Sequence, residues 1–345
     1  MHLWARERLD TQLRRKKTQE ALILFDRVLE DNDKQAHDWA FERRIWSHLE
    51  MVTQNLKLLA TVSDVMNDTV VFNAVSKIGN TYSEHGFYDL AGQLLQGALV
   101  SQEKTLGKDH PDTLATVHNM ASVFDNQGIY DKAQKWYQRA LDGSENTLGK
   151  GHPDTLATVH NMASVFYSQG IYDKAQKWYQ RALNGQEKTL GKDHPDTLTT
   201  VHNIASVFYN QGEYDKALEW YQQALDGKEK TLGKDHPDTL TTVHSMASMF
   251  YYHGESDKAL MWYQRALDGL EKTLGKDHPS TLNTVHNMAS VFAKQGEYHK
   301  ALMWYQRALD GKEKTLGKDH PSTLTTVHCM ASLFKQQGEY GRALK

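Results

Sequence analysis

Apolar and small residues recur with helical spacing in a segment that is written again every 42 residues along the chain. One copy carries the 3.6-residue period of an amphipathic helix on Leu114, Val117, Met120, Ala121 and Phe124. The same positions hold similar residues in the following copies. The pattern therefore predicts a series of near-identical helices, each with one apolar face.

A glycine turn and a second helical pattern follow in each copy. Gly128 is predicted to end the first helix in the left-handed conformation. A second helix is expected from about residue 130, with an inner side formed by Ala133, Trp136, Tyr137, Ala140 and Leu141. Gly143 lies inside this helix or at its end, and a glycine in a helix interior costs about 1 kcal/mol. The sequence leaves open whether the helix continues through Gly143 or kinks there.

A proline precedes the first helix in every copy. The phrase Leu-Gly-Lys-Asp-His-Pro ends at Pro111, Pro153, Pro195, Pro237, Pro279 and Pro321, with Gly151 replacing the aspartate in one copy. Proline blocks a helix that arrives from upstream. Asp112, which becomes Ser280 and Ser322 in later copies, is then predicted to be the N-cap. A unit this short cannot bury its own apolar face, so the copies are expected to stack.

The small and aromatic residues of the unit resemble those of the tetratricopeptide repeat. The pattern is carried by Ala121, Phe124, Gly128, Tyr130, Ala133, Tyr137 and Ala140. The 42-residue period is similar to the type found in kinesin light chains and in the repeat arrays of fungal NLR (NB-ARC or NACHT) proteins. This resemblance implies an all-α fold, a right-handed superhelical solenoid of helix hairpins whose first helices line a concave groove.

The repeat divides the chain into two predicted regions. Residues 1–68 form a helical lead-in segment, and residues 69–345 form the array, with units near 70–111, 112–153, 154–195, 196–237, 238–279, 280–321 and a truncated 322–345. Met330, Leu333 and Phe334 are expected to lack the helix that should cover them. The chain is therefore interpreted as a fragment, a shortened product or an array completed by a partner, and self-association through this uncovered helix is expected.

Composition narrows the class of partner. The net charge of −3 gives no electrostatic reason to expect nucleic acid or an anionic membrane surface as a partner. The single cysteine, Cys329, excludes a disulfide framework and is typical of the cytosol. No apolar run has the length of a membrane span or the character of a signal peptide. A soluble cytoplasmic protein is predicted.

Spacing argues against catalytic, nucleotide and metal sites. The segment from Gly143 to Lys150 has five residues between its glycines, where the phosphate-binding loop needs four, and Gly151 stands in place of its Ser or Thr. The His118-type histidines lie on successive repeats, on the order of 10 Å apart, too far to share one zinc ion. No enzyme activity, cofactor or metal is therefore expected, and a metal-dependent enzyme is kept only as a remote alternative.

The candidate binding groove has two parts. A histidine and a serine four residues apart, such as His118 and Ser122, recur on each first helix and are here called the His/Ser ladder. Two adjacent positions nearby, here called the variable pair, differ between copies and read Asp125-Asn126 in one and Tyr209-Asn210 in another. By the resemblance, both point into the groove, whereas drift at an exposed helix end is the alternative interpretation of the variable pair. The candidate partner-binding residues are His118, Ser122, His160, Ser164, Tyr167, His202, Ser206, Tyr209, Asn210, His244, Tyr251, Tyr252, His286, Lys294 and His328.

This groove is predicted to be neutral and rich in Tyr, His, Ser and Asn. It lacks the Lys and Arg pattern with which chaperone-binding relatives hold a terminal carboxylate, so a peptide or helical ligand that contacts tyrosines is favoured. Because an unperturbed histidine titrates near pH 6.5, the His ladder is expected to weaken or redirect binding in mild acid.

The function predicted from these features is a non-catalytic scaffold for protein–protein interaction. The segment His2-Leu3-Trp4-Ala5-Arg6 resembles the link between the nucleotide-binding half and the repeats of fungal NLR proteins. This favours the sensor or partner-binding arm of such a protein. A kinesin-light-chain-like cargo adaptor is the alternative, although residues 1–68 lack sustained heptads with charged flanks.

Overall fold

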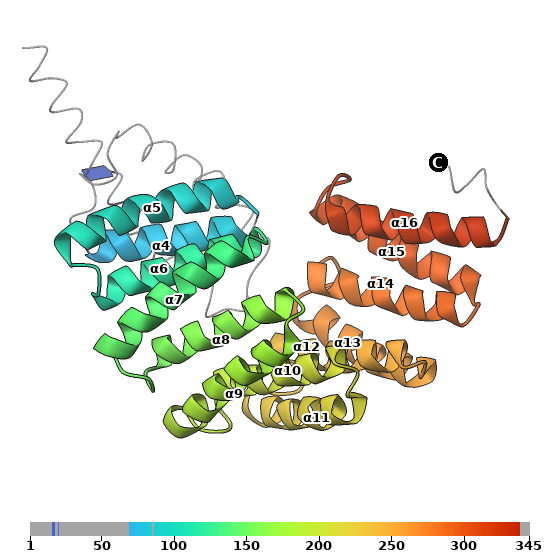
Figure 1. Cartoon of the computed structure of the whole chain (residues 1–345). Helices are drawn as coiled ribbons and strands as arrows, with labels where there is room; N and C mark the ends of the chain where they lie inside the picture. The colour runs from blue at the N-terminus through green and yellow to red at the C-terminus, as the bar shows by residue number, and fades with distance from the viewer. Residues whose placement is uncertain (1–15, 18–19, 21–68, 85, 339–345) are drawn as a thin grey trace, which may run out of the picture. The chain divides into compact units, whose positions relative to one another are not determined.

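The structure, a computed structural model, describes residues 16–17, 20, 69–84 and 86–338. From residue 69 onward these form helices joined by short turns, with no strand in the described ranges (Figure 1). The helices are α4 (Thr69–Glu84), α5 (Tyr88–Thr105), α6 (Pro111–Asn126), α7 (Tyr130–Thr147), α8 (Pro153–Ser168), α9 (Tyr172–Thr189), α10 (Pro195–Asn210), α11 (Tyr214–Thr231), α12 (Pro237–Tyr252), α13 (Ser256–Thr273), α14 (Pro279–Lys294), α15 (Tyr298–Thr315) and α16 (Pro321–Gln336). The predicted all-α array of helix hairpins is confirmed.

The chain divides into two compact units, Met1–Leu190 and Gly191–Lys345. In the first unit α4 packs on α5, α6 on α7 and α8 on α9, and each hairpin also contacts the next. In the second unit α10 packs on α11, α12 on α13 and α14 on α15, and α16 follows α15. Each unit is therefore a stack of consecutive hairpins, as expected for an α-solenoid.

The first helix of each repeat begins two residues earlier than the sequence indicates. The N-cap of α6 is His110, whose Nδ1 accepts a hydrogen bond from the Asp112 N–H at 3.2 Å, and Pro111 is the first helical residue. The prediction that Asp112 caps the helix is wrong. Its carboxylate lies in the first turn, where it is favourable to the helix dipole. The loop histidines therefore have a capping role in each copy.

The second helix continues through its glycine without a break. Helix α7 runs from Tyr130 to Thr147 and includes Gly143. A Cβ atom placed on Gly143 would lie 2.4 Å from Cδ2 of Leu114, which projects from α6. The equivalent glycines meet the equivalent leucines in the same way in each following hairpin. Glycine is therefore kept here because the two helices of a hairpin approach too closely for any side chain.

Alanines, valines, leucines and tyrosines recur in the buried core between the helices. Ala121, Ala133 and Ala140 are completely buried, as their invariance among the copies predicts. Val117 joins hairpins, because it packs on Leu99 of the preceding α5 and on Ala140 of its own partner helix. Apolar burial therefore runs without interruption from one hairpin to the next within a unit.

The apolar surface of the last helix differs from the expectation. Leu333 and Phe334 are 5% and 9% exposed and Met330 is partly buried, so the prediction that these three residues lie uncovered is wrong. The exposed apolar residues of α16 are Leu324 and Val327, at 52% and 41%.

Within the described residues, no helix combines the length and the apolar character needed to cross a membrane.

Candidate binding face

The histidine ladder of the candidate site connects neighbouring repeats. In the first unit, Nδ1 of His118 on α6 lies 3.0 Å from the Thr158 hydroxyl on α8, and its Nε2 lies 3.0 Å from the Asn161 amide nitrogen. The His118 ring also packs edge-on against Tyr137, with ring centroids 5.2 Å apart. Both ring nitrogens and one face of His118 are thus engaged by the array itself.

These partners fix the tautomer of the imidazole. The Thr158 hydroxyl donates to the Asp154 carbonyl at 2.9 Å, so its oxygen accepts a hydrogen bond from Nδ1–H of His118. Nε2 then carries no proton and accepts from the Nδ2 amide of Asn161. A neutral histidine satisfies every partner, whereas a protonated one would place an N–H opposite an N–H donor.

The same connection recurs in the second unit. Nδ1 of the histidine meets a threonine hydroxyl at 3.0–3.1 Å in the pairs His202–Thr242, His244–Thr284 and His286–Thr326. Burial lowers the pKa of His118, His244 and His286 to about 4 and that of His202 to about 3. The expectation that this ladder titrates in mild acid is wrong for these four histidines, because their neutral form is held inside the stack.

The serines of the ladder join the two helices of one hairpin. The Ser122 hydroxyl lies 2.7 Å from the Tyr137 hydroxyl. The equivalent distances are 2.7–2.8 Å for the pairs Ser206–Tyr221, Ser248–Tyr263 and Ser290–Tyr305. Ser164 and His160 occupy the same positions and are half-buried, and the His160 ring packs edge-on against Tyr179. The ladder therefore supports the face on which the variable residues lie.

The variable pair places aromatic side chains at the carboxyl ends of the first helices. In the first unit the ring centroid of Tyr167 lies 5.8 Å from that of Tyr172, at the start of the next helix. In the second unit Tyr209 contacts both Tyr214 and Tyr252, at 5.8 and 6.3 Å. Tyr252 is 68% exposed. The structure thus brings Tyr209, Tyr251 and Tyr252 together as an aromatic surface in the second unit.

Several of the other variable positions are polar. Asn210 is exposed and its amide donates to the Ser206 carbonyl at 2.8 Å, and Lys294 is also exposed. His328, the last histidine of the ladder, is exposed as well. In the first unit Asp125 occupies the tyrosine position, and burial raises the pKa of its carboxyl to about 6. The face therefore changes from aspartate through tyrosine to lysine between copies, while its supporting ladder stays the same.

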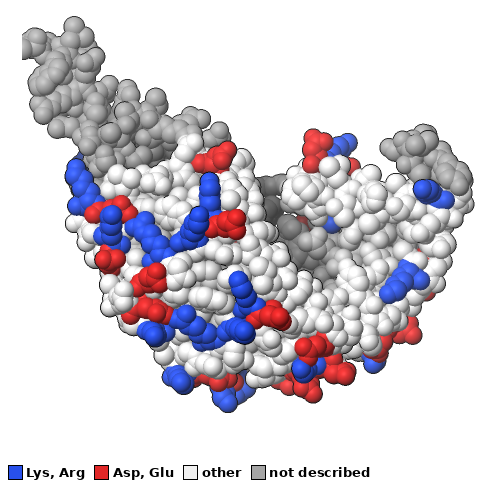
Figure 2. Space-filling model, in the orientation of Figure 1, with Lys and Arg blue, Asp and Glu red and all other residues white. Residues whose placement is uncertain are grey.

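The second helices present a different surface, dominated by paired charges. Over the part of the first unit that Figure 2 shows, basic side chains lie beside acidic ones. Ion pairs link successive second helices at Arg139–Glu103, Arg181–Glu145, Arg265–Glu229 and Arg307–Glu271. Each arginine also lies over a tryptophan of its own helix. Sequence reasoning missed this bridge, although the recurrence of Glu and Arg 36 residues apart was a signal for it.

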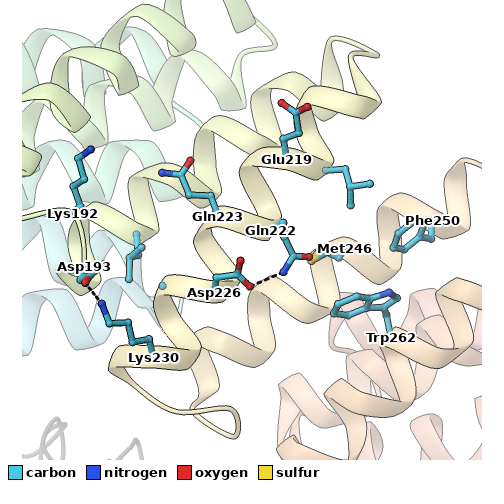
Figure 3. Close-up of a pocket in the computed structure, with 13 residues that line it drawn as sticks. Lys192, Asp193, Glu219, Gln222, Gln223, Asp226, Lys230, Met246, Phe250 and Trp262 are labelled. Carbon is cyan, nitrogen blue, oxygen red and sulfur yellow. Dashed lines mark hydrogen bonds and ion pairs between the residues drawn. The ribbon is translucent and has the colours of Figure 1, made fainter.

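A cavity of about 930 Å³ opens on this side of the second unit. Trp262 and Phe250 lie at one end of it and Lys192 at the other, with α11 between them (Figure 3). Two of its charged groups are paired, since Lys230 contacts Asp193 at 2.6 Å. Arginine occupies the equivalent of its lining residue Gln223 in most other copies, so the shorter glutamine leaves this hollow less filled.

Two buried lysines were also missed by the sequence analysis. Lys228 and Lys312 are 3% and 2% exposed, at a position where other copies carry Ser, Gln or Leu. Each ammonium donates to the threonine that also meets the ladder histidine, Thr242 at 3.3 Å and Thr326 at 3.2 Å. Burial lowers the pKa of Lys312 to about 8.

Within the described residues, no group of three His, Cys, Asp or Glu side chains could hold a metal ion.

Comparisons with known proteins agree with this architecture. The sequence profile of the family described as Tetratricopeptide repeat matches residues 71–146, 114–188, 154–230, 199–272, 246–314 and 280–345. No curated protein matches the chain. A crystal structure of a Podosopora anserina putative kinesin light chain, with nearly identical TPR-like repeats, is 26% identical with a TM-score of 0.51. The match covers 60% of this chain and 98% of that one.

Two further solved structures share the fold at lower identity. BtubC (BKLC) from P. vanneervenii is 19% identical with a TM-score of 0.54, over 71% of this chain and 94% of its own. NprR in complex with its cognate peptide NprX is 16% identical with a TM-score of 0.58, over 91% of this chain and 88% of its own. At these identities the likeness shows the fold alone.

Proposed function

The chain belongs to the tetratricopeptide repeat family, and from this premise we propose that it is a non-catalytic scaffold for protein–protein interaction. Its ligand is a peptide or helical segment of a partner protein. The segment lies along the first helices and contacts the variable pair of each copy. The neighbour NprR, which has been solved with its cognate peptide, supports a peptide as the ligand.

The observation that carries this proposal is the exposed aromatic surface at the ends of α10 and α12. Tyr252 is 68% exposed and Tyr214 39% exposed, although large aromatic side chains are costly to leave in water. Tyrosine is also among the residues most enriched where partners bind tightly. Tyr209 and Tyr251 extend this surface in the second unit, and Tyr167 occupies the same register position in the first unit.

Replacing Tyr167, Tyr209 and Tyr251 together with alanine is expected to reduce partner capture at least tenfold. Each tyrosine removed from a binding centre costs on the order of 1 kcal/mol or more. The measurement is affinity capture from native lysate with the full chain, after circular dichroism confirms that the variant folds. The matched control replaces Met261 and Met303, exposed residues of the second helices, with alanine. Equal capture by wild type and the tyrosine variant would contradict binding at this face.

The cellular role that we propose is the sensor or partner-binding arm of an NLR-like protein in the cytoplasm. Its support is the resemblance of His2-Leu3-Trp4-Ala5-Arg6 to the link that precedes such arrays, and these residues lie outside the described part of the chain. The alternative role is a kinesin-light-chain-like cargo adaptor. The likeness to the P. anserina putative kinesin light chain favours this alternative.

We also propose that the chain self-associates through α16. Leu324 is 52% exposed, whereas Leu282, which occupies the same position one copy earlier, is 1% exposed. Replacing Leu324 and Val327 with serine is expected to lower the dimer fraction in sedimentation velocity, because the variant loses the apolar contact. Serine at Met261 and Met303, which are similarly exposed, should leave that fraction unchanged. A wild-type chain that sediments as a monomer at every concentration would remove this proposal.

A further inference from the structure

Aromatic rings form a continuous run of contacts across the second unit. Beginning at His253, ring centroids lie 5.0 Å apart to Tyr214, 5.8 Å from there to Tyr209, 6.3 Å to Tyr252 and 5.0 Å to Tyr251. These five residues, here called the aromatic run, come from the hairpins α10–α11 and α12–α13. Their rings meet at angles between 48° and 69°, so they contact one another edge-to-face or tilted.

A cation already occupies one end of the aromatic run. Lys294, from α14, places its Nζ 4.6 Å from the ring centroid of Tyr251. The same ammonium donates a hydrogen bond to the Tyr251 carbonyl at 2.7 Å. A positive charge over a tyrosine face is attracted by the ring quadrupole. The Lys294 ammonium thus shows that a ring of the aromatic run can bind a positively charged group.

The opposite end of the aromatic run combines exposed rings with carboxylates. Glu213 directly precedes Tyr214 in the chain, and Glu255 lies 3.5 Å from Nδ1 of His253. Each glutamate also pairs with a lysine three residues later, and these are exposed ion pairs of the weak kind. This end therefore offers aromatic faces with the Glu255 carboxylate beside His253, and Glu213 adds a second carboxylate next to Tyr214 in the chain.

Arginine is the side chain that fits both features. Its planar guanidinium stacks on an aromatic face while its N–H groups donate to a carboxylate in a fixed geometry. The protein itself uses this combination on its second helices, where Arg265 lies over Trp262 and pairs with Glu229. Lysine, as a strongly hydrated point charge, makes the first contact but not the planar one.

We propose that the aromatic run is a binding site for an arginine side chain of a partner segment. The guanidinium stacks on the exposed rings of Tyr252 and Tyr214 and pairs with the neighbouring glutamates. This inference rests on the proposed function, because it names the chemistry of the ligand bound at the same face. Lys294 occupies the other end, so the cationic residue of the partner lies toward His253.

The test measures fluorescence anisotropy of labelled hexa-arginine, hexa-lysine and hexa-glutamate peptides with the full chain at physiological salt. Hexa-arginine is expected to bind most tightly and hexa-glutamate least. Alanine at Tyr214 and Tyr252 together should weaken hexa-arginine binding by about tenfold. The matched control is Tyr298→Ala, at the register position of Tyr214 two hairpins later and outside the aromatic run. This control should leave binding unchanged.

A second pair of variants separates ring binding from general charge. Lys294→Gln and Lys300→Gln each remove one exposed positive charge, but only Lys294 lies over a ring of the aromatic run. Lys294→Gln is expected to tighten hexa-arginine binding about threefold more than Lys300→Gln, because it opens the Tyr251 face. Equal effects of the two variants would contradict occupation of the rings by cations.

The outcomes distinguish this inference from the proposed function. Equal affinity for hexa-arginine and hexa-lysine, or tyrosine variants that bind like wild type, would overturn the arginine site. Partner capture that still depends on Tyr167, Tyr209 and Tyr251 would then keep the proposed function in place with a different ligand chemistry. If hexa-arginine binding is not selective and partner capture does not depend on these tyrosines, the face is not a binding surface.

Discussion

Acidification from pH 6.5 to pH 5 is expected to destabilise the array by about 1–2 kcal/mol for each of the four ladder histidines whose pKa is lowered. The pKa of His118, His244 and His286 is lowered to about 4 and that of His202 to about 3, from 6.5. Between these values the unfolded chain binds more protons than the folded one, so stability falls as the pH falls. The contribution is fully present above pH 6.5 and is lost down to the folded pKa values.

The physical cause is the neutral tautomer held between repeats. A proton added to His244 would place an N–H against the Asn287 amide, which now donates to Nε2 at 3.0 Å. The charge would also be buried without a carboxylate beside it, which is costly. Acid is therefore expected to loosen the contacts between hairpins before the helices themselves melt.

Urea unfolding followed by circular dichroism at pH 7 and pH 5 measures this effect. In the double variant His244→Gln with His286→Gln, the urea concentration at the unfolding midpoint should fall less between pH 7 and pH 5 than in wild type, because glutamine does not titrate. His328→Gln is the matched control, since His328 occupies the same register position but is exposed. A double variant with the same acid sensitivity as wild type would show that the ladder does not control it.

Replacing Gly185 with alanine is expected to lower the free energy of unfolding by about 1–3 kcal/mol. A Cβ atom at this position would lie 2.3 Å from Cδ2 of Leu156 and 3.0 Å from its Cδ1. Leu156 is 2% exposed, so it has little room to move away. The clash outweighs the benefit of about 1 kcal/mol that alanine normally brings to a helix interior.

Gly92 provides the matched control in the same unit. It also lies inside a helix, α5, but no described atom comes within 4 Å of a Cβ placed there. Gly92→Ala is therefore expected to stabilise the chain by about 0.5–1 kcal/mol. Thermal unfolding by calorimetry should give midpoint shifts of opposite sign for the two variants. Shifts of the same sign would show that contact with Leu156 does not decide the outcome.

The sequence by itself determined the hairpin array and the position of its variable surface. The 42-residue period fixes the repeat, the 3.6-residue spacing marks both helices, and the glycine after Gln127 ends the first one. These features follow from local rules of the backbone and from burial of a single face, so they can be read without knowing which residues meet. Comparison of the copies likewise singled out Tyr209, Tyr251 and Tyr252, because their positions vary between copies while most neighbouring positions do not.

Tertiary structure alone decided the roles of the repeated polar residues. His110 is the cap because its ring folds back onto the Asp112 N–H, and His118 is neutral because Thr158 and Asn161, from the next repeat, surround it. Gly143 lies inside a continuous helix because Leu114 of the partner helix leaves no room for a side chain at this position. The contacts of His118 and Gly143 join residues some 30 to 43 positions apart, whereas His110 and Asp112 are two positions apart. Their geometry depends on how closely the helices pack, which the order of residues does not state.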